Sequence, residues 1–258
     1  MNATQTVSHN LANTKSDKPV IDINNLKKGF SEQEVLTNVS LKLFDGENLV
    51  VLGKSGSGKS VLIKCIVRLL NPDDGTINVL GEDVSTLNSN GLGELRKKIG
   101  FLFQSGALYD SMTVRQNLEF PLRRIKKDLT QKEINEKVNE VLENVGLSNA
   151  IDKMPSQLSG GMRKRISLAR TIVVDPLIML YDEPTTGLDP VTSDEISSLI
   201  NEVQKKYKTS SIIITHDIEC ARYTADRVIM LKEGEVYSEG KVEEFEKSTD
   251  PLIKSFFK

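Results

Sequence analysis

The sequence predicts an α/β fold built on a mostly parallel sheet. Short apolar runs alternate with segments of helical period along the 258-residue chain, as in folds whose helices cover a parallel sheet. Leu49–Leu52, Leu177–Tyr181 and Ser211–Thr215 are three such runs, and each is followed by glycine or by polar residues. A chain of this length buries roughly three quarters of its unfolded surface, which is enough for one large domain.

A glycine-rich turn joins the first of these strands to a predicted helix, Lys59–Leu70. Glycines let backbone N–H groups converge on an anion, and the helix N-terminus adds about half a positive charge there. Lys59 is expected to reach the β- and γ-phosphates of a nucleotide, and Ser60 to offer its hydroxyl to Mg²⁺. The flanking strand and helix disfavour a surface turn that matches by chance. The residues expected to hold ATP here are Gly53, Lys54, Ser55, Gly56, Ser57, Gly58, Lys59, Ser60 and Val61.

Two carboxylates follow the strand at Leu177–Tyr181. The carboxyl ends of parallel strands face the ligand crevice, so Asp182 is placed to hold Mg²⁺ directly or through water. Glu183 is placed to act as general base on the attacking water, a role worth about 10² to 10⁴ in rate. A solvated Asp-Glu pair after a strand is also common, so the pair alone leaves that alternative open.

Three further features extend this site. His216 follows the strand Ser211–Thr215, and its place at the same sheet edge favours a γ-phosphate contact over a helix cap. Gln104 follows another apolar segment, and its amide can ligate Mg²⁺ or the attacking water. Leu158–Met162 forms a Gly-Gly turn that opens a helix, which makes a second anion site with no substrate in its own subunit.

In their order, these motifs resemble the ATP-binding subunit of ABC transporters, from about Val20 to Lys258. The family's fold is a RecA-like P-loop NTPase domain with an inserted α-helical subdomain, here about residues 105–170, and an antiparallel β subdomain. Residues 1–18 are then a flexible tail and 19–258 the ATP-binding domain. The matching motifs are Walker A at Gly53–Ser60, Q-loop Gln104, signature Leu158–Met162, Walker B ending at Asp182, catalytic Glu183, D-loop Asp189 and switch His216.

The resemblance implies a mechanism and two partners. Two copies of the chain dimerise head to tail around two ATP molecules, and Ser159, Gly160 and Gly161 of one copy cap the γ-phosphate held by Lys59 of the other. An integral membrane permease docks a coupling helix on the helical subdomain. Phe30 lies where the family stacks an aromatic ring on adenine, and an ordinary apolar residue at the end of a strand is the less favoured alternative.

The apolar residues after Gln104 are candidates for that docking surface, and the alternative is that they fill the core of the subdomain. They are Ala107, Leu108, Met112 and Val114.

The signature departs from the common ABC pattern, because Met162 stands where Gln is usual. Met at this position resembles the ATPases of Mla-type phospholipid-transport systems, which work with MCE-domain proteins. Phe103–Val114, Asn117–Arg123 and Gly187–Ser193 are similar to the same subgroup. The resemblance implies phospholipid transport between membranes with a permease and an MCE-domain partner. Import of a polar solute such as an amino acid is the alternative.

The net charge and the set of motifs disfavour several other classes of protein. A net charge of −2 gives no sign of a nucleic-acid surface, and Arg163–Arg165 is interpreted as the solvated face of a helix. No long coiled-coil insertion and no second cassette is visible, which disfavours DNA-repair and translation roles. Intact Glu183 and His216 disfavour a regulatory module without turnover. Cys65 and Cys220 fit core positions in a reducing compartment.

No apolar run approaches the roughly 18 residues that span a bilayer, and no signal peptide is visible. The expected location is therefore cytoplasmic, peripheral on the cytoplasmic face of the inner membrane.

Two helical segments have clear sequence signals. Thr130 and Glu133 form a capping box at the start of one helix, and an apolar stripe at Ile196–Val203 marks another. The C-terminal segment Val242–Lys258 carries aromatic residues among charges, which fits either closure of the core or a clasp on a neighbouring subunit.

Overall fold

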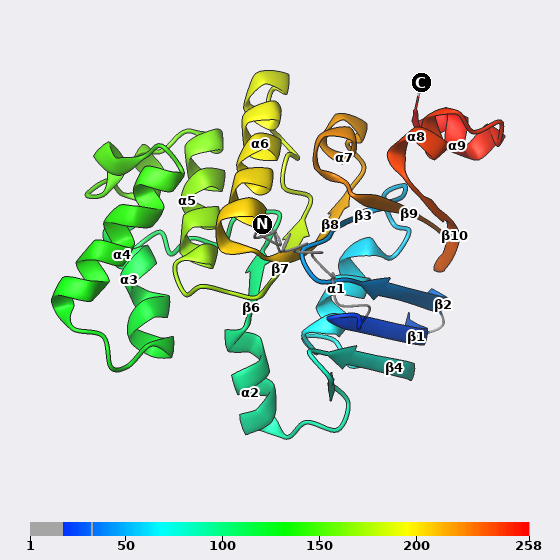
Figure 1. Ribbon diagram of the computed structural model, residues 1–258, viewed down its shortest axis with the longest axis horizontal. Coiled ribbons are helices and arrows are strands. Elements are labelled where there is room, and N and C mark those ends of the chain that lie inside the picture. Colours follow the sequence, from blue (N-terminus) through cyan, green and yellow to red (C-terminus); the bar gives the residue numbers. More distant parts are fainter. Residues whose placement is uncertain (1–17, 32, 258) are drawn as a thin grey trace, which may run out of the picture.

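The computed structural model describes residues 18–31 and 33–257, and within them one ten-stranded sheet runs in the order β5-β4-β1-β2-β10-β9-β3-β8-β7-β6 (Figure 1). Of the predicted tail, residues 1–17 lie outside the described residues. The strands are β1 (Ile21–Phe30), β2 (Gln33–Leu43), β3 (Asn48–Leu52), β4 (Asp74–Val79), β5 (Glu82–Asp83), β6 (Ile99–Leu102), β7 (Ile178–Asp182), β8 (Ser210–Thr215), β9 (Arg227–Lys232) and β10 (Glu235–Gly240). The helices are α1 (Lys59–Ile66), α2 (Ser89–Lys97), α3 (Val114–Ile125), α4 (Gln131–Asn144), α5 (Gly160–Ile172), α6 (Pro190–Tyr207), α7 (Ile218–Thr224), α8 (Val242–Glu246) and α9 (Pro251–Phe256), with 3-10 turns at Ser148–Ala150 and Pro155–Gln157.

Strands β9, β3, β8, β7 and β6 form the parallel centre of the sheet. Every residue of β3, β7 and β8 is buried, as expected for parallel strands covered on both faces. Alternate residues serve two cores: Val50 and Leu52 join the cluster with α3–α7, while Leu49 and Val51 join the one with α1 and α2. The predicted α/β class is therefore confirmed.

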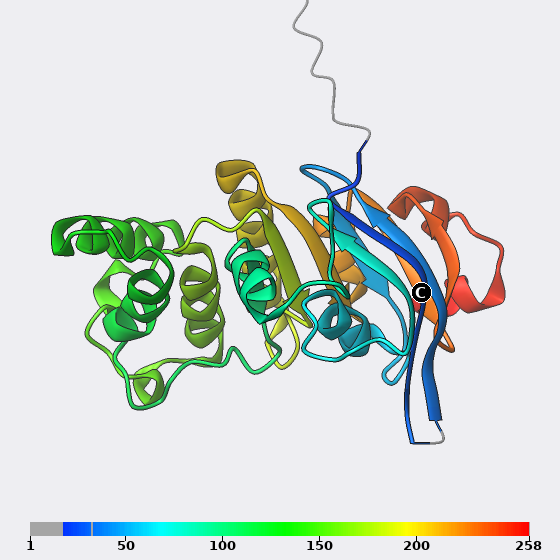
Figure 2. The same cartoon turned by 90° about the horizontal axis from the view of Figure 1, so that it is seen from below.

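The two subdomains lie at opposite ends of the molecule (Figures 1 and 2). Strand β1 pairs antiparallel with β2 and β4, and β4 with β5, which forms the expected antiparallel β subdomain. Helices α3, α4 and α5 come between β6 and β7 in the chain and pack together beyond the β6 edge. The site at the ends of the parallel strands thus has a β layer on one side and a helical layer on the other.

Two predicted helix boundaries have different outcomes. The capping box is confirmed, since Thr130 and Glu133 bond reciprocally at the start of α4. The first helix ends at Ile66, four residues before the predicted Leu70. Arg68 adopts a φ of 50° and the amides of Leu69 and Leu70 turn back to the carbonyl of Lys64, which closes the helix early.

The C-terminal segment packs on its own chain. Phe245 and Ile253 are buried in the core that contains α3–α7, and Phe257 lies 5.9 Å from the Phe245 ring, centroid to centroid. These contacts confirm closure of the core. Cys65 and Cys220 are buried and unpaired, also as expected. Across residues 18–31 and 33–257, no helix combines the length and the apolar character needed to cross a membrane.

Candidate active site

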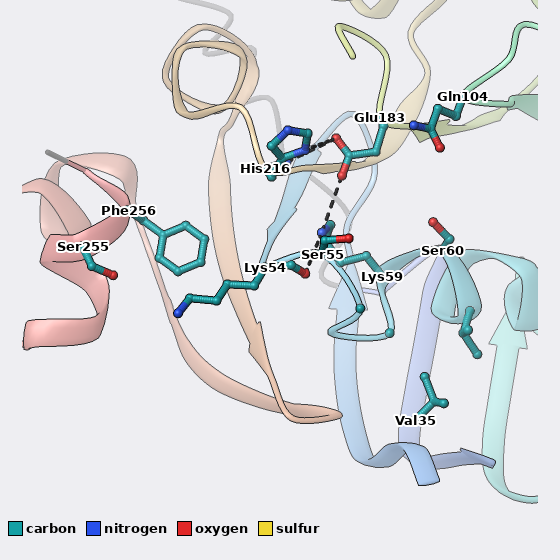
Figure 3. Close-up of a pocket in the computed structure, with 13 residues that line it drawn as sticks. Val35, Lys54, Ser55, Lys59, Ser60, Gln104, Glu183, His216, Ser255 and Phe256 are labelled. Carbon is teal, nitrogen blue, oxygen red and sulfur yellow. Dashed lines mark hydrogen bonds and ion pairs between the residues drawn. The ribbon is translucent and has the colours of Figure 1, made fainter. Parts of the chain in front are cut away.

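The ends of β3, β7 and β8 open onto a cavity of about 860 Å³ (Figure 3). Ten of the predicted site residues line it: Lys54, Ser55, Gly56, Gly58, Lys59, Ser60, Val61, Gln104, Glu183 and His216. Segments that are far apart in the chain thus converge because parallel strands end at one edge of the sheet.

Lys59 is the first residue of α1, and its side chain is held inside the glycine loop. Its Nζ donates to the carbonyls of Gly53 (2.7 Å) and Lys54 (3.2 Å) and lies 3.5 Å from Glu183 Oε1. Gly58, directly before it, has φ 98°, and a Cβ there would lie 2.6 Å from Leu36 Cδ2. Only glycine fits that position, so the loop conformation that orients Lys59 depends on it.

Ser60 and Asp182 form an oxygen pair beside the lysine. The Ser60 hydroxyl donates to Asp182 Oδ1 at 2.9 Å. Burial raises the pKa of the Asp182 carboxyl, and the bond from Ser60 opposes that rise. Gln104 and Asp182 also line an adjoining cavity of about 520 Å³.

These oxygens suit a hard cation. Mg²⁺ needs only one or two carboxylates when phosphates and waters complete its coordination. Among the described residues, no three His, Cys, Asp or Glu side chains cluster as a protein-only metal cage. The donor set therefore fits a magnesium ion that arrives with a nucleotide.

Glu183 occupies the centre of the site in a strained conformation. Its φ is 49°, a region that costs a non-glycine residue about 1 to 3 kcal/mol. Its Oε2 accepts hydrogen bonds from Thr186 Oγ1 (3.2 Å) and the His216 amide (3.3 Å), and lies 2.8 Å from His216 Nδ1. These bonds hold the carboxylate between Lys59 and His216, facing the cavity (Figure 3).

His216 does not cap the following helix. Asp217 caps α7 by accepting from the amides of Glu219 (3.0 Å) and Cys220 (3.2 Å). The histidine is left facing the cavity beside Glu183, as predicted.

The signature residues lie away from this cavity. Ser159 caps α5 by accepting from the Met162 amide at 3.2 Å, and Ser159 and Gly160 are exposed. A Cβ on Gly161 would lie 2.5 Å from Thr192 Cγ2, so glycine allows the start of α5 to approach α6. Asp189 caps α6 by accepting from Thr192, and these bonds lower the pKa of its carboxyl.

Phe30 lies at the end of β1 with 45% of its surface exposed, and Lys28 Nζ is 5.3 Å from its ring centroid. It does not line the cavity, and its stacking on adenine stays a prediction. Ser57 lines a smaller neighbouring cavity, and Gly53 contributes its carbonyl to Lys59.

Several residues of the site were not predicted. Val35, Ser255 and Phe256 line the cavity, the last two from α9. Lys164 was expected on a solvated face within Arg163–Arg165, and this prediction is wrong: its side chain is buried. Helical spacing gives the reason, since Lys164 shares a stripe with the buried Ser167 and Leu168. Val114, one of the candidates for the docking surface, is fully buried, which confirms for this residue the alternative that it fills the subdomain core.

A glycine loop that holds a lysine, a carboxylate and a histidine at the same cavity, and a second carboxylate bonded to Ser60 beside it together define a P-loop ATPase site. Residues 36–186, more than half of the chain, match the ABC transporter family. The chain belongs to that family and carries its ATP-binding domain, an ATPase.

The chain is 40% identical over 236 residues to the "Probable ribonucleotide transport ATP-binding protein mkl" of Mycobacterium tuberculosis, covering 92% of this chain and 66% of that protein. It is 36% identical over 224 residues to "Methionine import ATP-binding protein MetN" of Brucella abortus, covering 87% and 60%. It is 37% identical over 254 residues to "Protein TRIGALACTOSYLDIACYLGLYCEROL 3, chloroplastic" of Arabidopsis thaliana, covering 92% and 73%. The chain thus spans less than two thirds of the length of the first two relatives.

Solved structures agree on the fold. The chain is similar to the dimeric ATP-binding cassette MJ0796 bound to ADP and Pi, with a TM-score of 0.79, 32% identity and coverage of 86% of this chain and 98% of that one. It is also similar to cbiO1 of Clostridium perfringens, part of the cbiONQ ABC transporter complex, with a TM-score of 0.80, 31% identity and coverage of 88% and 90%.

Proposed function

We propose that this protein is the ATPase subunit of an ABC transporter that energises phospholipid transport between membranes, docked on a separate permease at its cytoplasmic face. The observation that carries the ATPase part is the convergence of Lys59, Glu183 and His216 on one cavity. The substrate part rests on the resemblance at Met162 and in the segment after Gln104.

The chemistry follows from these side chains. Lys59 binds the β- and γ-phosphates of ATP, and the Glu183 carboxylate takes the proton of the attacking water. His216, whose Nδ1 is 2.8 Å from Glu183 Oε2, holds the carboxylate in place and contacts the γ-phosphate. Ser60, Asp182 and the amide of Gln104 would hold Mg²⁺, which would neutralise phosphate charge when bound.

We propose that a second copy of the chain completes the site. Ser159 and Gly160 are exposed at the start of α5 and do not line their own cavity, and the MJ0796 structures to which the chain is similar are dimeric. A helix N-terminus with free N–H groups suits a γ-phosphate presented by a partner. Asp189 is exposed at the start of α6. It accepts a hydrogen bond from the Thr192 hydroxyl, and the methyl group of Thr192 packs close to Gly161. A preparation blocked from self-association that hydrolyses ATP at the full rate would contradict this part.

A groove beside the Q-loop supports docking of the permease. It has a volume of about 440 Å³ and contains the stacked rings of Phe101 and Phe103, 4.2 Å apart. Tyr109 and Arg170 also line it, with the guanidinium carbon 4.8 Å from the centroid of the Tyr109 ring. An aromatic groove with one cation next to Gln104 fits a short amphipathic coupling helix of the permease.

The substrate class has two candidates with separate support. The Mla-type resemblance favours phospholipid with an MCE-domain partner, and one relative is named after a galactolipid. The similarity to a methionine import protein favours an amino acid as the alternative. Met162 itself packs against the subdomain core, so it leaves the backbone of Gly160 and Gly161 free to cap an anion.

The test is isolation of the native complex in mild detergent, with mass spectrometry of its subunits and bound small molecules. The lipid proposal expects an integral permease, an MCE-domain protein and co-purified phospholipid. Recovery of an extracytoplasmic amino-acid-binding protein in their place overturns the lipid proposal and supports the alternative. A complex reconstituted in phospholipid vesicles is expected to hydrolyse ATP faster than the isolated chain.

A further inference from the structure

A buried lysine lies on the signature helix, close to the site but outside the cavity. Lys164 is only 7% exposed, and with Lys59 it is one of two buried lysines among residues 18–31 and 33–257. It stands in the second turn of α5, one turn after the Ser159 cap and the exposed Gly160. An amphipathic side chain of this length normally keeps its ammonium group in water, so its burial calls for a physical reason.

The ammonium group joins three segments. Lys164 Nζ donates to the carbonyl of Gln104 at 2.6 Å and to the carbonyl of Glu183 at 3.3 Å. One atom of the signature helix thus holds the backbone of the Q-loop and the backbone of the Walker B glutamate. A lysine offers three donors, and these two bonds offset part of the cost of burial.

The electrostatic setting fits a cation at this point. Burial lowers the pKa of Lys164, whereas the carboxylates of Asp182 and Glu183 act to raise it. The same cation therefore interacts electrostatically with the Asp182 and Glu183 carboxylates. A neutral side chain of similar length would fill the space without these interactions.

The bond to Glu183 matters because of the backbone there. Glu183 has φ 49°, and its amide donates to the Ile214 carbonyl at 2.9 Å. Lys164 holds the carbonyl on the other side of the same residue. The amide of Thr186 also donates to the Glu183 carbonyl, at 3.3 Å, so Lys164 supplies one of the two hydrogen bonds that fix this carbonyl. A residue in the left-handed region persists only where its surroundings fix it.

We propose that Lys164 is a positioning residue for ATP hydrolysis: it fixes the carbonyls of Gln104 and Glu183 to the signature helix and so keeps the Glu183 carboxylate aimed into the cavity. Lys164 does not touch the nucleotide, so it acts through Glu183. The inference rests on the proposed role of Glu183 as general base.

The experiment compares Lys164→Met and Lys164→Leu, two neutral variants, with Lys164→Gln, whose amide keeps N–H donors. Steady-state hydrolysis gives kcat and KM, and a fluorescent ATP analogue with Mg²⁺ gives nucleotide affinity. Both neutral variants are expected to lose about 10- to 100-fold in kcat, since small misplacements of a reacting group cost that much. Nucleotide affinity is expected to stay within about threefold, because Lys59 and its loop are untouched. Lys164→Gln is expected to recover most of the rate, because its amide keeps N–H donors.

Lys137→Met is the matched control. Lys137 donates to both Asp175 oxygens at 2.6 Å within the helical layer and lies outside the site, so its loss is expected to leave kcat within about twofold. The inference is overturned if either folded neutral variant keeps the wild-type kcat. It is also overturned if nucleotide affinity falls as much as kcat, or if Lys164→Gln is as slow as Lys164→Met.

A parallel Glu183→Gln arm separates this inference from the one it rests on. Wild-type turnover in Glu183→Gln refutes the role of Glu183 as general base and therefore also refutes the positioning role of Lys164. An inactive Glu183→Gln with an active Lys164→Met refutes the positioning role alone.

Discussion

Replacement of Glu183 by glutamine removes the proposed general base and leaves the shape of the site intact. In the structure its carboxylate is held by Thr186, by His216 and by Lys59 Nζ at 3.5 Å. A glutamine can keep the bond from Thr186, but it cannot take a proton from water. General-base catalysis is worth about 10² to 10⁴ in rate, or about 3 to 5 kcal/mol of activation free energy. We expect kcat to fall by that factor.

The same change has the opposite effect on ATP binding. At 3.5 Å the attraction between Lys59 and Glu183 is about 5 kcal/mol at an effective dielectric constant of 20, before the cost of desolvation is subtracted. Lys59 must give up part of this attraction to bind a γ-phosphate, and the carboxylate also repels that phosphate. The glutamine variant is therefore expected to bind ATP at least as tightly as the wild type and to remain in an ATP-bound closed dimer.

The assays are phosphate release for turnover, titration of a fluorescent ATP analogue for affinity, and size-exclusion chromatography with light scattering for mass. Glu140→Gln is the matched control, because Glu140 pairs with Lys206 on the surface at 3.3 Å, away from the cavity. Wild-type turnover in Glu183→Gln would refute the general-base role. Weaker ATP binding in that variant would refute the electrostatic reasoning.

Lys59→Ala is expected to abolish hydrolysis and weaken ATP binding at least tenfold, measured by the same assays, because the only buried cation in the loop is lost; unchanged turnover would contradict the phosphate role. Leu108 lies next to Tyr109 of the proposed groove and packs partly against the subdomain core; Leu108→Asp is expected to remove stimulation by the permease, and normal assembly of the complex would argue against docking there. Burial raises the pKa of Cys65 and of Cys220 to about 11, so neither thiol is expected to react with Ellman's reagent at pH 8 until the chain is unfolded; rapid reaction of the native protein would contradict their burial.

The parts of the site that the sequence predicts are those whose geometry is local or set by strand ends. Lys59 and Ser60 are placed by the turn that contains them. Asp182 ends β7 and His216 directly follows β8, two neighbouring parallel strands, so their position at one edge of the sheet follows from topology alone.

The parts of the site that were not predicted depend on tertiary packing, or on the helical period rather than on adjacency in sequence. Lys164 was grouped with its neighbours in sequence as a basic run, whereas the helical period places it on the buried stripe with Ser167 and Leu168. Phe256 comes to the cavity from the last helix of the fold, and no local pattern near it points to the glycine loop. The early end of α1 depends on Arg68 in a left-handed conformation, which side-chain periodicity does not report.

Glu183 receives restraints from four separate segments: the glycine loop through Lys59, the end of β8 through His216, the following turn through Thr186, and, on our proposal, the signature helix through Lys164. If Glu183 is the general base, as we propose, its position responds to movement of any of these four segments. A displacement of about 1 Å at a reacting group costs roughly 10²-fold in rate, which corresponds to about 3 kcal/mol. Helix α5 packs against α3 and α4, so a force applied to the helical subdomain reaches Glu183 through one ammonium group. If the permease docks at the groove beside Gln104, as we propose, its binding is expected to change the rate of hydrolysis without contact with the nucleotide.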